Sequence, residues 1–434
     1  MSTETYDALV IGCGPGGSSA SSYLARAGKR VLVLEKEVFP RFHIGESLLP
    51  YNQIILRELG LLPAVEAAGF PRKLAAQFFL GNGSLNTRYV FGEGRFNKET
   101  QIFQVERSKF DHILLKHARS LGADVREGWS VKKTLSDADA VTVEAVDPDG
   151  KTHNFRASFV IDASGRSNLT GTQEGLKEVH PRLKKLAVFG HFKNVELDPG
   201  DAAGDTIIVR LENKWFWIIP VSAEKTSVGL VLDRDEFAQN GGVGPEVFQR
   251  WLDSSPVMRN RMRKAQLEGP MRTLTDISYY NRRLVSHRML RVGDAAGFMD
   301  PIFSAGVHLA MWSGKLAALA VLETLASGGD GARRFRKFEK KVRGGMHFYW
   351  QMVESYYTKP FMELFLQPRD HINVPDAVNA VLAGELEGAW NLRWRLRYFY
   401  LLVKWQARRA IVPRITFASL RSVEAPVEVN GKSA

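Results

Sequence analysis

Cysteine is almost absent from this sequence of 434 residues, since Cys13 is the only one. A single cysteine excludes an internal disulfide and a zinc site built on cysteine pairs. Cys13 lies inside a glycine-rich loop, which favours a small packed residue over a nucleophile. The sequence therefore predicts no metal site, and its low cysteine content favours a cytoplasmic protein.

Long hydrophobic runs are lacking as well. No apolar run reaches the ~20 residues that a membrane span needs, and the N-terminus has no basic segment followed by a cleavage site. The apolar residues 8–11 lead directly into the glycine loop. We therefore expect neither a signal peptide nor an integral membrane protein.

Acidic residues are too few to balance the basic ones, at 47 against 59, which gives a net charge of +12. Nucleic acid, a membrane surface, or anionic proteins and cofactors could each account for such a charge. No nucleic-acid motif and no basic arm of low complexity is present. We therefore favour an anionic flavin and an acidic protein partner as its explanation.

The N-terminus carries a complete strand–helix–strand pattern. Residues 6–11 predict a buried strand, residues 18–27 a helix of small residues, and residues 31–34 a second buried strand that ends at Glu35. A glycine-rich turn joins the first strand to the helix. Strand, glycine turn, helix, strand and acid together form the context that a dinucleotide-binding fingerprint requires.

Three glycines of this turn have a physical role in the fingerprint. Gly12 permits the tight turn, Gly14 lets the backbone approach a pyrophosphate, and Gly17 lets the helix pack against the strand. The helix N-terminus directs free N–H groups at the phosphates, and the Glu35 carboxylate can accept from ribose hydroxyls. The alternative is a glycine turn in a parallel sheet without a ligand.

Two later turns favour FAD over NAD. Residues 293–297, Gly-Asp-Ala-Ala-Gly, follow a predicted strand, and Asp294 can hold the ribityl hydroxyls of FAD. Residues 162–166, Asp-Ala-Ser-Gly-Arg, end another strand at Asp162 and are less diagnostic. Either turn alone could be an ordinary strand-to-helix connection, but with the first loop they predict an FAD site.

The remaining chain predicts a discontinuous fold. We expect a helix at residues 108–121, strands at 131–146 and 155–161, a strand-like stretch with short turns at about 185–280, and helices from 307 to about 410. The late return to the first sheet at Gly293 predicts an α/β protein: a Rossmann-like FAD-binding domain, an inserted mainly β substrate domain and a helical C-terminal region. The predicted boundaries are 1–75, 100–180 and 280–345 for the first, 76–99 and 181–279 for the second, and 346–434 for the third, with disorder in the last dozen residues.

Four segments, in order along the chain, resemble the flavin-dependent halogenases. They are residues 39–50 (FPRFHIGESLLP), 69–78 (GFPRKLAAQF), 215–220 (WFWIIP) and 300–310 (DPIFSAGVHLA). The third matches the family's W-x-W-x-I-P signature, in which two tryptophans at this spacing are rare by chance. A core strand with alternating aromatics is the alternative explanation of that segment.

The resemblance implies roles for residues beyond the glycine loop. Lys73 falls where the family carries its essential lysine, whose amine can hydrogen-bond hypohalous acid or form a haloamine. The backbone amides of Ala305 and Gly306 would bind the halide, since successive N–H groups form an anion nest. Many relatives have Ser or Thr where this chain has Ala305, which puts only a side-chain contribution in doubt. Phe303 stands where tryptophan halogenases carry glutamate, which argues against free tryptophan as substrate.

The tryptophan motif, Trp215 and Trp217 with Pro220, is thought in the family to block direct hydroxylation at the flavin. The two tryptophans would lie on one face of a strand. The resemblance also implies an FAD-binding fold of the aromatic-hydroxylase type. The further residues expected to bind FAD are Pro15, Gly16, Lys36, Arg41, Gly45, Glu46, Ser47, Arg107, Pro301 and Gly306.

The implied reaction is halogenation of an electron-rich aromatic, a phenol or pyrrole, free or tethered to a carrier protein, in natural-product biosynthesis. A separate NAD(P)H-dependent reductase would supply FADH2, because no second dinucleotide fingerprint is visible. Oxygen would give a flavin hydroperoxide, and chloride or bromide would attack it to give hypohalous acid, which travels to Lys73. No base for the substrate can be named, since a lone histidine such as His308 is more often packed.

Three other functions stay open on the sequence. A class A-type flavin monooxygenase would hydroxylate an aromatic or polyketide without a partner reductase and without Lys73. A geranylgeranyl-reductase-like enzyme would place the C-terminus at a membrane. An FAD-binding scaffold without activity is the third.

Aromatic and basic residues are interleaved between 390 and 409. We favour a helix that packs its aromatic residues inward and exposes a basic face to solvent. The alternatives are a docking surface for an acidic carrier protein and a membrane-surface helix. The residues are Trp390, Arg393, Trp394, Arg395, Arg397, Tyr398, Tyr400, Lys404, Trp405, Arg408 and Arg409.

Overall fold

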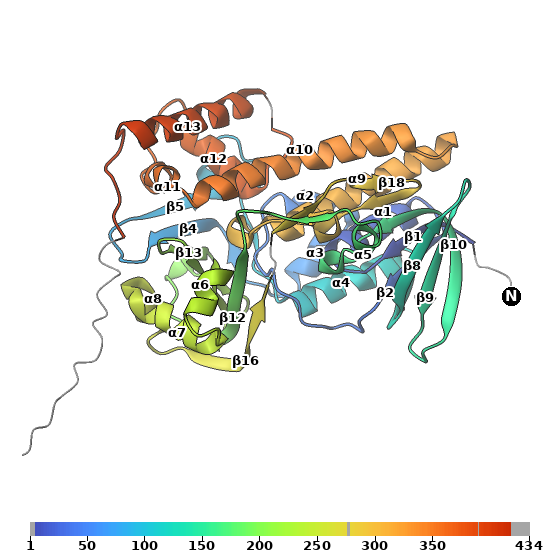
Figure 1. Cartoon of the computed structure of the whole chain (residues 1–434), viewed down its shortest axis with the longest axis horizontal. Coiled ribbons are helices and arrows are strands. Elements are labelled where there is room, and N and C mark those ends of the chain that lie inside the picture. Colours follow the sequence, from blue (N-terminus) through green and yellow to red (C-terminus); the bar gives the residue numbers. More distant parts are fainter. Residues whose placement is uncertain (1–4, 276–277, 389, 418–434) are drawn as a thin grey trace, which may run out of the picture.

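The structure is a computed structural model that describes residues 5–275, 278–388 and 390–417. Two large β-sheets lie toward opposite ends of the molecule, and long helices run along its upper side (Figure 1). The disorder expected for the last dozen residues concerns a segment outside the described residues.

The first sheet has eight strands, ordered β18-β19-β10-β1-β2-β7, with the β8–β9 hairpin attached to β10. Its parallel register sets Ile11 opposite both Leu34 and Asp162, and Asp162 opposite Arg291. The carboxyl ends of these strands therefore meet at one edge, where doubly wound sheets bind ligands. The strands are β1 (Thr5–Ile11), β2 (Val31–Glu35), β7 (Asp124–Glu127), β8 (Ser130–Ser136), β9 (Val141–Val146), β10 (Thr152–Asp162), β18 (Val285–Ser286) and β19 (Met289–Arg291).

Small residues let helices pack closely on this sheet. A Cβ on Gly314 of α9 (Ala305–Ser327) would lie 2.4 Å from the carbonyl oxygen of Gly16 in α1 (Pro15–Arg26), so both backbones meet here. Helix α9 is by length and composition apolar enough to cross a membrane, so the expectation that no apolar run is long enough is wrong. Helix α9 can be this apolar because it packs inside the protein. More than half of its apolar stretch is buried, and it contacts both α1 and α10 (Ala332–Tyr356).

The second sheet has seven strands, ordered β16-β12-β15-β14-β13-β4-β5, and all pairs except β13–β4 are antiparallel. The purely strand-like expectation for residues 185–280 is wrong, because three helices occur within it. Their apolar residues cover one face of the sheet, with Phe248 stacking on Phe192. The elements are β4 (Ala75–Leu80), β5 (Asn86–Val90), β12 (Lys185–Lys193), β13 (Thr206–Arg210), β14 (Trp215–Pro220), β15 (Thr226–Asp233), β16 (Gln266–Leu274), α6 (Arg234–Gln239), α7 (Gly244–Ser254) and α8 (Pro256–Met262).

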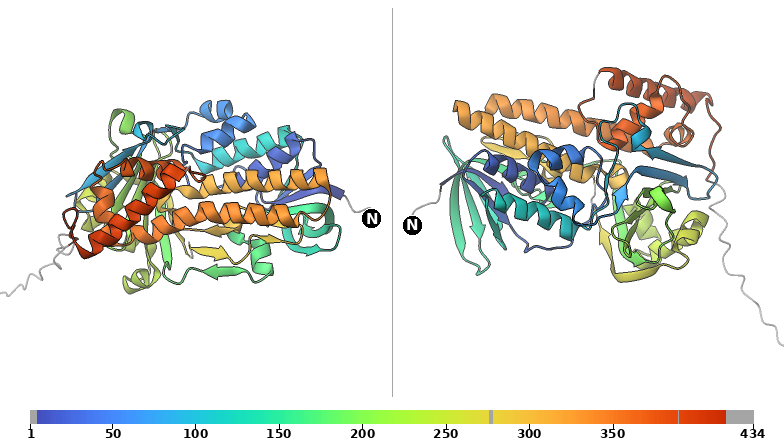
Figure 2. Two further views of the ribbon diagram at one scale, coloured as in Figure 1. Left: turned by 90° about the horizontal axis from the view of Figure 1, so that it is seen from above. Right: turned by 180° about the vertical axis from the view of Figure 1, so that it is seen from behind.

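The helical C-terminal part packs beside β4 and β5, at the far end from the N-terminal strand (Figure 2). Phe365 packs edge-on against Phe78 of β4, and the Tyr89 hydroxyl of β5 donates to the Phe365 carbonyl oxygen. These helices are α11 (Lys359–Leu366), α12 (Val374–Ala383) and α13 (Trp390–Arg408). The remaining helices and strands are α2 (Asn52–Leu59), α3 (Leu62–Glu66), α4 (Arg107–Ser120), α5 (Leu169–Gln173), β3 (Arg72–Lys73), β6 (Ile102–Phe103), β11 (Lys177–Val179), β17 (Tyr279–Asn281) and β20 (Gly297–Phe298).

Candidate functional site

A cavity of about 530 Å³ lies between the carboxyl edge of the first sheet and the inner face of the second. Its volume falls within the range of cofactor and small-molecule pockets. The glycine loop, residues 41–47 and most of residues 292–310 line it on one side, and Ile208, Trp215 and Trp217 line it on the other. Residues far apart in the sequence thus meet at one site.

The glycine loop has the geometry expected of a dinucleotide site. Gly12 has φ +91°, a backbone conformation that favours glycine. A Cβ on Gly17 would lie 1.9 Å from the Gly12 carbonyl oxygen, whereas a Cβ on Gly14 would meet only the Arg41 side chain, at 3.7 Å. Gly17 therefore permits helix packing, and Gly14 leaves backbone open toward the cavity. The N-cap residue of α1, Gly14, makes no side-chain capping bond, so the first N–H groups of the helix are available to an anion.

Glu35 lies buried at the end of β2, and its carboxylate holds the loop in place. One oxygen accepts from the backbone N–H of Cys13 at 2.7 Å, and the other accepts from that of Glu37 at 2.9 Å. Each oxygen keeps a second lone pair for a ligand hydroxyl at the cavity that Glu35 lines. Burial raises the pKa of the Cys13 thiol to about 12, which confirms a packed residue rather than a nucleophile.

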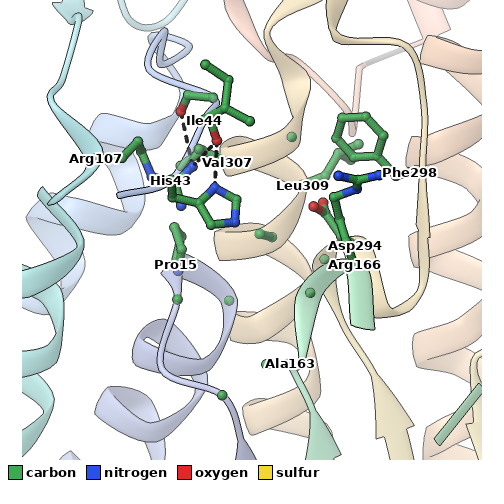
Figure 3. Close-up of a pocket in the computed structure, with 18 of the residues that line it drawn as sticks. Pro15, His43, Ile44, Arg107, Ala163, Arg166, Asp294, Phe298, Val307 and Leu309 are labelled. Carbon is green, nitrogen blue, oxygen red and sulfur yellow. Dashed lines mark hydrogen bonds between the residues drawn. The ribbon is translucent and has the colours of Figure 1, made fainter. Parts of the chain in front are cut away.

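Within the part of the chain that the structure describes, Asp294 brings a carboxylate without a protein hydrogen-bond donor to the cavity wall. Its side chain lines the cavity and has no hydrogen-bond donor among the described residues. Burial raises its pKa to about 6, although the Arg107 and Arg166 cations oppose this. Figure 3 shows Asp294 and Arg166 on one side of the cavity, facing Arg107 and His43 on the other. Ligand hydroxyls that donate to this carboxylate would satisfy it, so the site fits the ribityl chain of FAD.

Arg107 shapes the opposite wall. Its guanidinium is buried, pairs with Asp111 at 2.8 Å, and donates to the carbonyl oxygens of Ile44 and Gly45. Asp111 also binds Arg41 at 2.9 Å. Burial and the Arg107 cation lower the pKa of His43 to about 4, so its ring is neutral. The segment between the second strand and the flavin is thereby held rigidly against the cavity.

Lys73 lies on β3, just beyond the cavity, and is 1% exposed. Its amine donates to the Ser47 hydroxyl at 2.9 Å and to the Leu48 carbonyl oxygen at 3.0 Å. No carboxylate pairs with it among the described residues, and burial lowers its pKa to about 7. Ser47 lines the cavity and also contacts the Thr206 hydroxyl at 2.8 Å. A neutral amine is therefore available at neutral pH, one hydroxyl away from the cavity.

The two tryptophans lie on one face of β14, as predicted, with ring centroids 6.0 Å apart. The Trp217 indole donates to the Ser227 hydroxyl, and the Trp215 indole donates to the Tyr357 hydroxyl. A Cβ on Gly229 would lie 2.2 Å from the Trp217 ring, so glycine on the neighbouring strand makes room for it. Both rings are buried parts of the cavity wall.

The segment after Asp300 turns sharply into α9. Ser304 has φ +55° and precedes Ala305, the first residue of the helix. The amides of Ala305 and Gly306 therefore have no intrahelical acceptor, and both residues line the cavity. His308, one turn further, is fully buried away from the cavity lining; burial lowers its pKa to about 4, so it is a packed residue.

The cavity lining contains most of the residues predicted from the sequence. Four predicted residues lie outside it: Gly17 and Pro220 act through the backbone, Lys73 lies behind Ser47, and Asp162 accepts from Ser164 and Thr170 to shape its own turn. The predicted residues in the lining are Gly12, Gly14, Pro15, Gly16, Glu35, Lys36, Arg41, Gly45, Glu46, Ser47, Arg107, Trp215, Trp217, Gly293, Asp294, Pro301, Ala305 and Gly306.

Sequence reasoning missed the polar connection behind Trp215. The Tyr357 hydroxyl accepts from the Trp215 indole at 2.9 Å, across 142 residues of chain, and donates to Asp300 at 2.5 Å, across 57 residues. Thr206 beside Ser47 was also missed. Nothing local in the sequence marks either residue. Tyr357 meets Trp215 only when the C-terminal helices pack on the second sheet, and Thr206 meets Ser47 only when that sheet packs on the segment after β2.

Asp294→Asn is expected to weaken FAD binding about tenfold to a hundredfold at pH 8, because hydrogen bonds to a charged acceptor are lost. The wild-type affinity should fall as the pH drops below about 6, where the Asp294 carboxylate takes up a proton, and the variant should lack this dependence. Flavin fluorescence titration between pH 5 and 8 measures both. Asp253→Asn, an exposed change on α7, is the control; equal pH dependence in all three proteins would contradict the role of Asp294.

Comparisons with known proteins agree on the cofactor. Residues 5–331 match the FAD binding domain family. The 1H-pyrrole-2-carbonyl-(peptidyl-carrier protein) chlorinase of Pseudomonas fluorescens is 30% identical over 82% of this chain and 84% of its own length. The tryptophan 2-halogenase of Chondromyces crocatus is 34% identical over 80% of this chain and 67% of its own length. The solved structure of the flavin-dependent brominase Bmp2 superposes with a TM-score of 0.84 at 27% identity, covering 93% of this chain and 100% of that one.

Proposed function

This chain belongs to the flavin-dependent halogenases, and on that premise we propose that it chlorinates or brominates an electron-rich ring carried as a thioester on a carrier protein. It is an FAD-dependent enzyme. The observation that carries the proposal is the buried Lys73 amine, which has no carboxylate partner among the described residues and whose pKa of about 7 leaves about half of it neutral at pH 7. A carboxylate-bound lysine would be charged and a poor acceptor of electrophilic halogen.

We propose that the cavity residues hold FAD, with the glycine loop on the pyrophosphate, Glu35 on a ribose and Asp294 on the ribityl chain. When bound, reduced FAD would activate oxygen, which would be the two-electron oxidant of the halide. The free amides of Ala305 and Gly306 hold the halide beside it. The predicted division into an FAD-binding domain, an inserted substrate domain and a C-terminal region is the corresponding domain assignment.

Lys73 and the two tryptophans then keep the oxidation of the halide, in the flavin cavity, apart from the halogenation of the ring, at Lys73. Trp215 and Trp217 fill the wall of the second sheet and keep a substrate ring from reaching the flavin directly. Hypohalous acid would reach Lys73 at Ser47, whose hydroxyl lies in the cavity lining and accepts from the Lys73 amine. Lys73 presents the halogen to the ring. The ring carbon gains the halogen and loses its proton, and the hydroxide left from hypohalous acid takes up a proton to leave as water.

The carrier-bound substrate is supported by surface chemistry as well as by relatives. The Pseudomonas fluorescens relative is named for a pyrrole on a peptidyl-carrier protein, although the Chondromyces crocatus relative is named for tryptophan. Helix α13 exposes Trp390 by 78% and Trp405 by 51% beside its basic residues. The favoured prediction of inward aromatics is wrong for these two. Phe303, packed edge-on against Tyr356, supports a substrate other than free tryptophan.

The proposal is tested by incubating the protein with FAD, a separate NAD(P)H-dependent flavin reductase, oxygen and bromide. The substrates are pyrrole-2-carboxylate on a carrier protein and the free acid. Mass spectrometry should show a bromine isotope pattern on the carrier-bound ring and much less on the free acid. An added oxygen atom in place of bromine would identify a hydroxylase, and equal bromination of both substrates would remove the carrier from the proposal.

A further inference from the structure

A second cavity, of about 430 Å³, lies on the far side of Tyr357 from the first. Arg210, Tyr357 and Lys359 contribute to its lining. Its position follows from the second sheet, because Arg210 stands opposite Trp215 at the end of β13. The hydrogen bonds from Trp215 to Tyr357 and from Tyr357 to Asp300 form the partition between the two cavities. No step of the proposed halogen chemistry uses this second cavity.

Arg210 is a buried cation with no carboxylate partner among the residues that the structure describes. It is 2% exposed, and its contacts are the Lys214 carbonyl oxygen at 3.3 Å and the faces of Tyr356 and Tyr357, at 5.1 and 5.0 Å from the ring centroids. Its Nε is buried without an acceptor, and no acceptor is found for Nη2 among the described residues. The guanidinium stays charged at neutral pH, and because Nε is enclosed, Nη2 is the donor left over for an anion at the cavity that Arg210 lines.

Other groups at the cavity add positive potential. Lys359 is exposed at its rim and begins the eight-residue helix α11, whose N-cap Thr358 makes no side-chain capping bond. Lys185 lies 4.1 Å from the Tyr357 ring centroid, although Asp233 pairs with it. The opposing charge in the lining is Glu212, which is exposed to solvent. An oxyanion with several acceptor oxygens suits a guanidinium, an ammonium and a helix N-terminus together.

Strand β13 connects this cavity to Lys73. Thr206, Ile208 and Arg210 alternate along one face of the strand, and Thr206 contacts the Ser47 hydroxyl that accepts from Lys73. Four residues of strand span about 13 Å. An anion at Arg210 would thus lie about 13 Å along the strand from the neighbourhood of the reacting ring. A flexible arm that carries the ring at one end and a charge at the other could span that separation.

We propose that the second cavity binds the phosphate group of the arm that tethers the substrate ring to its carrier protein. The proposal rests on the carrier-bound substrate proposed above. The phosphodiester of a phosphopantetheine arm supplies the oxyanion, Arg210 binds it by its free guanidinium N–H groups, and Lys359 adds attraction at the rim. The subsite thereby positions the thioester end toward Lys73 without contacting the ring.

Binding is tested on the FAD-loaded protein by calorimetry, without any turnover. Phosphopantetheine should bind at least about tenfold more tightly than pantetheine, because a charge-assisted pair is worth about that much or more. Inorganic phosphate should bind more weakly than phosphopantetheine. Equal affinities for phosphate and phosphopantetheine would show a site for free phosphate. Equal affinities for pantetheine and phosphopantetheine would show that the phosphate group does not contribute to binding. Either result would overturn the proposal.

Turnover variants separate a binding role from a structural one. Arg210→Gln should raise the KM for the pyrrolyl thioester of phosphopantetheine about tenfold, with kcat and the KM for the dephospho thioester changed less than about twofold. Lys359→Gln, at an exposed residue, should raise only the first KM, by a smaller factor. Equal loss on both thioesters in both variants would mean that Arg210 is structural. If the carrier-bound ring is not brominated, the proposed function fails, while the calorimetric preference still decides the subsite.

Discussion

Lys73→Met is expected to reduce bromination by at least about a hundredfold while FAD binding stays unchanged, since removing a group that handles the reacting species typically costs that much. FAD binding is insulated from the change because Lys73 lies outside the cavity lining and meets it only through Ser47. Single-turnover bromination with pre-reduced FAD measures the rate, and flavin fluorescence measures binding. Lys214→Met is the control, because Lys214 is also a buried lysine. Unlike Lys73, it forms an ion pair with a carboxylate, Glu236 of α6.

The pH dependence should follow the state of the Lys73 amine. With a pKa of about 7, a step that needs the neutral amine should speed up about tenfold per pH unit below 7 and level off above it. The folded protein also holds fewer protons than the unfolded chain between about pH 7 and 10.5. The free energy of unfolding should therefore rise with pH through this interval relative to Lys73→Met, and the difference should be constant below it. A wild-type rate independent of pH from 5 to 9, together with full activity of Lys73→Met, would remove Lys73 from the reaction.

Gly17→Ala is expected to abolish FAD binding and destabilise the protein by several kcal/mol, because its Cβ would lie 1.9 Å from the backbone oxygen of Gly12. Neither backbone can move without separating α1 from β1. Thermal unfolding of the apoprotein should show a large fall in Tm, before any cofactor is involved.

Gly14→Ala provides the matched comparison within the same loop. Its Cβ would meet only the Arg41 side chain, at 3.7 Å, so the Tm of the apoprotein should change little. Affinity for FAD should still fall, because the added methyl group lies where the pyrophosphate would approach. A Gly14→Ala protein with normal FAD affinity would show that the cofactor does not approach the loop there, and an unchanged apoprotein Tm in Gly17→Ala would contradict the packing role of Gly17.

The sequence by itself determined the features that depend on neighbours along the chain. Gly12, Gly17 and Glu35 could be identified because a strand, a tight turn and a helix place them within one local unit. The alternation in β14 likewise placed Trp215 and Trp217 on one face. Helices α6 to α8 were missed because they are short segments inside a strand-rich region, where apolar periodicity is brief.

Only the tertiary structure decided which groups meet across the chain. Lys73 became a buried amine with a lowered pKa because Ser47 and Leu48 enclose it, and a local run of residues cannot show that desolvation. In the sequence, Arg210 looks like an ordinary cation on a strand. In the structure its neighbours are the rings of Tyr356 and Tyr357, which lie more than a hundred residues later in the chain, where a carboxylate would be expected. Burial and long-range charge act through space, so the pattern of the chain predicts where chemistry is plausible and the packing decides which groups are left free to perform it.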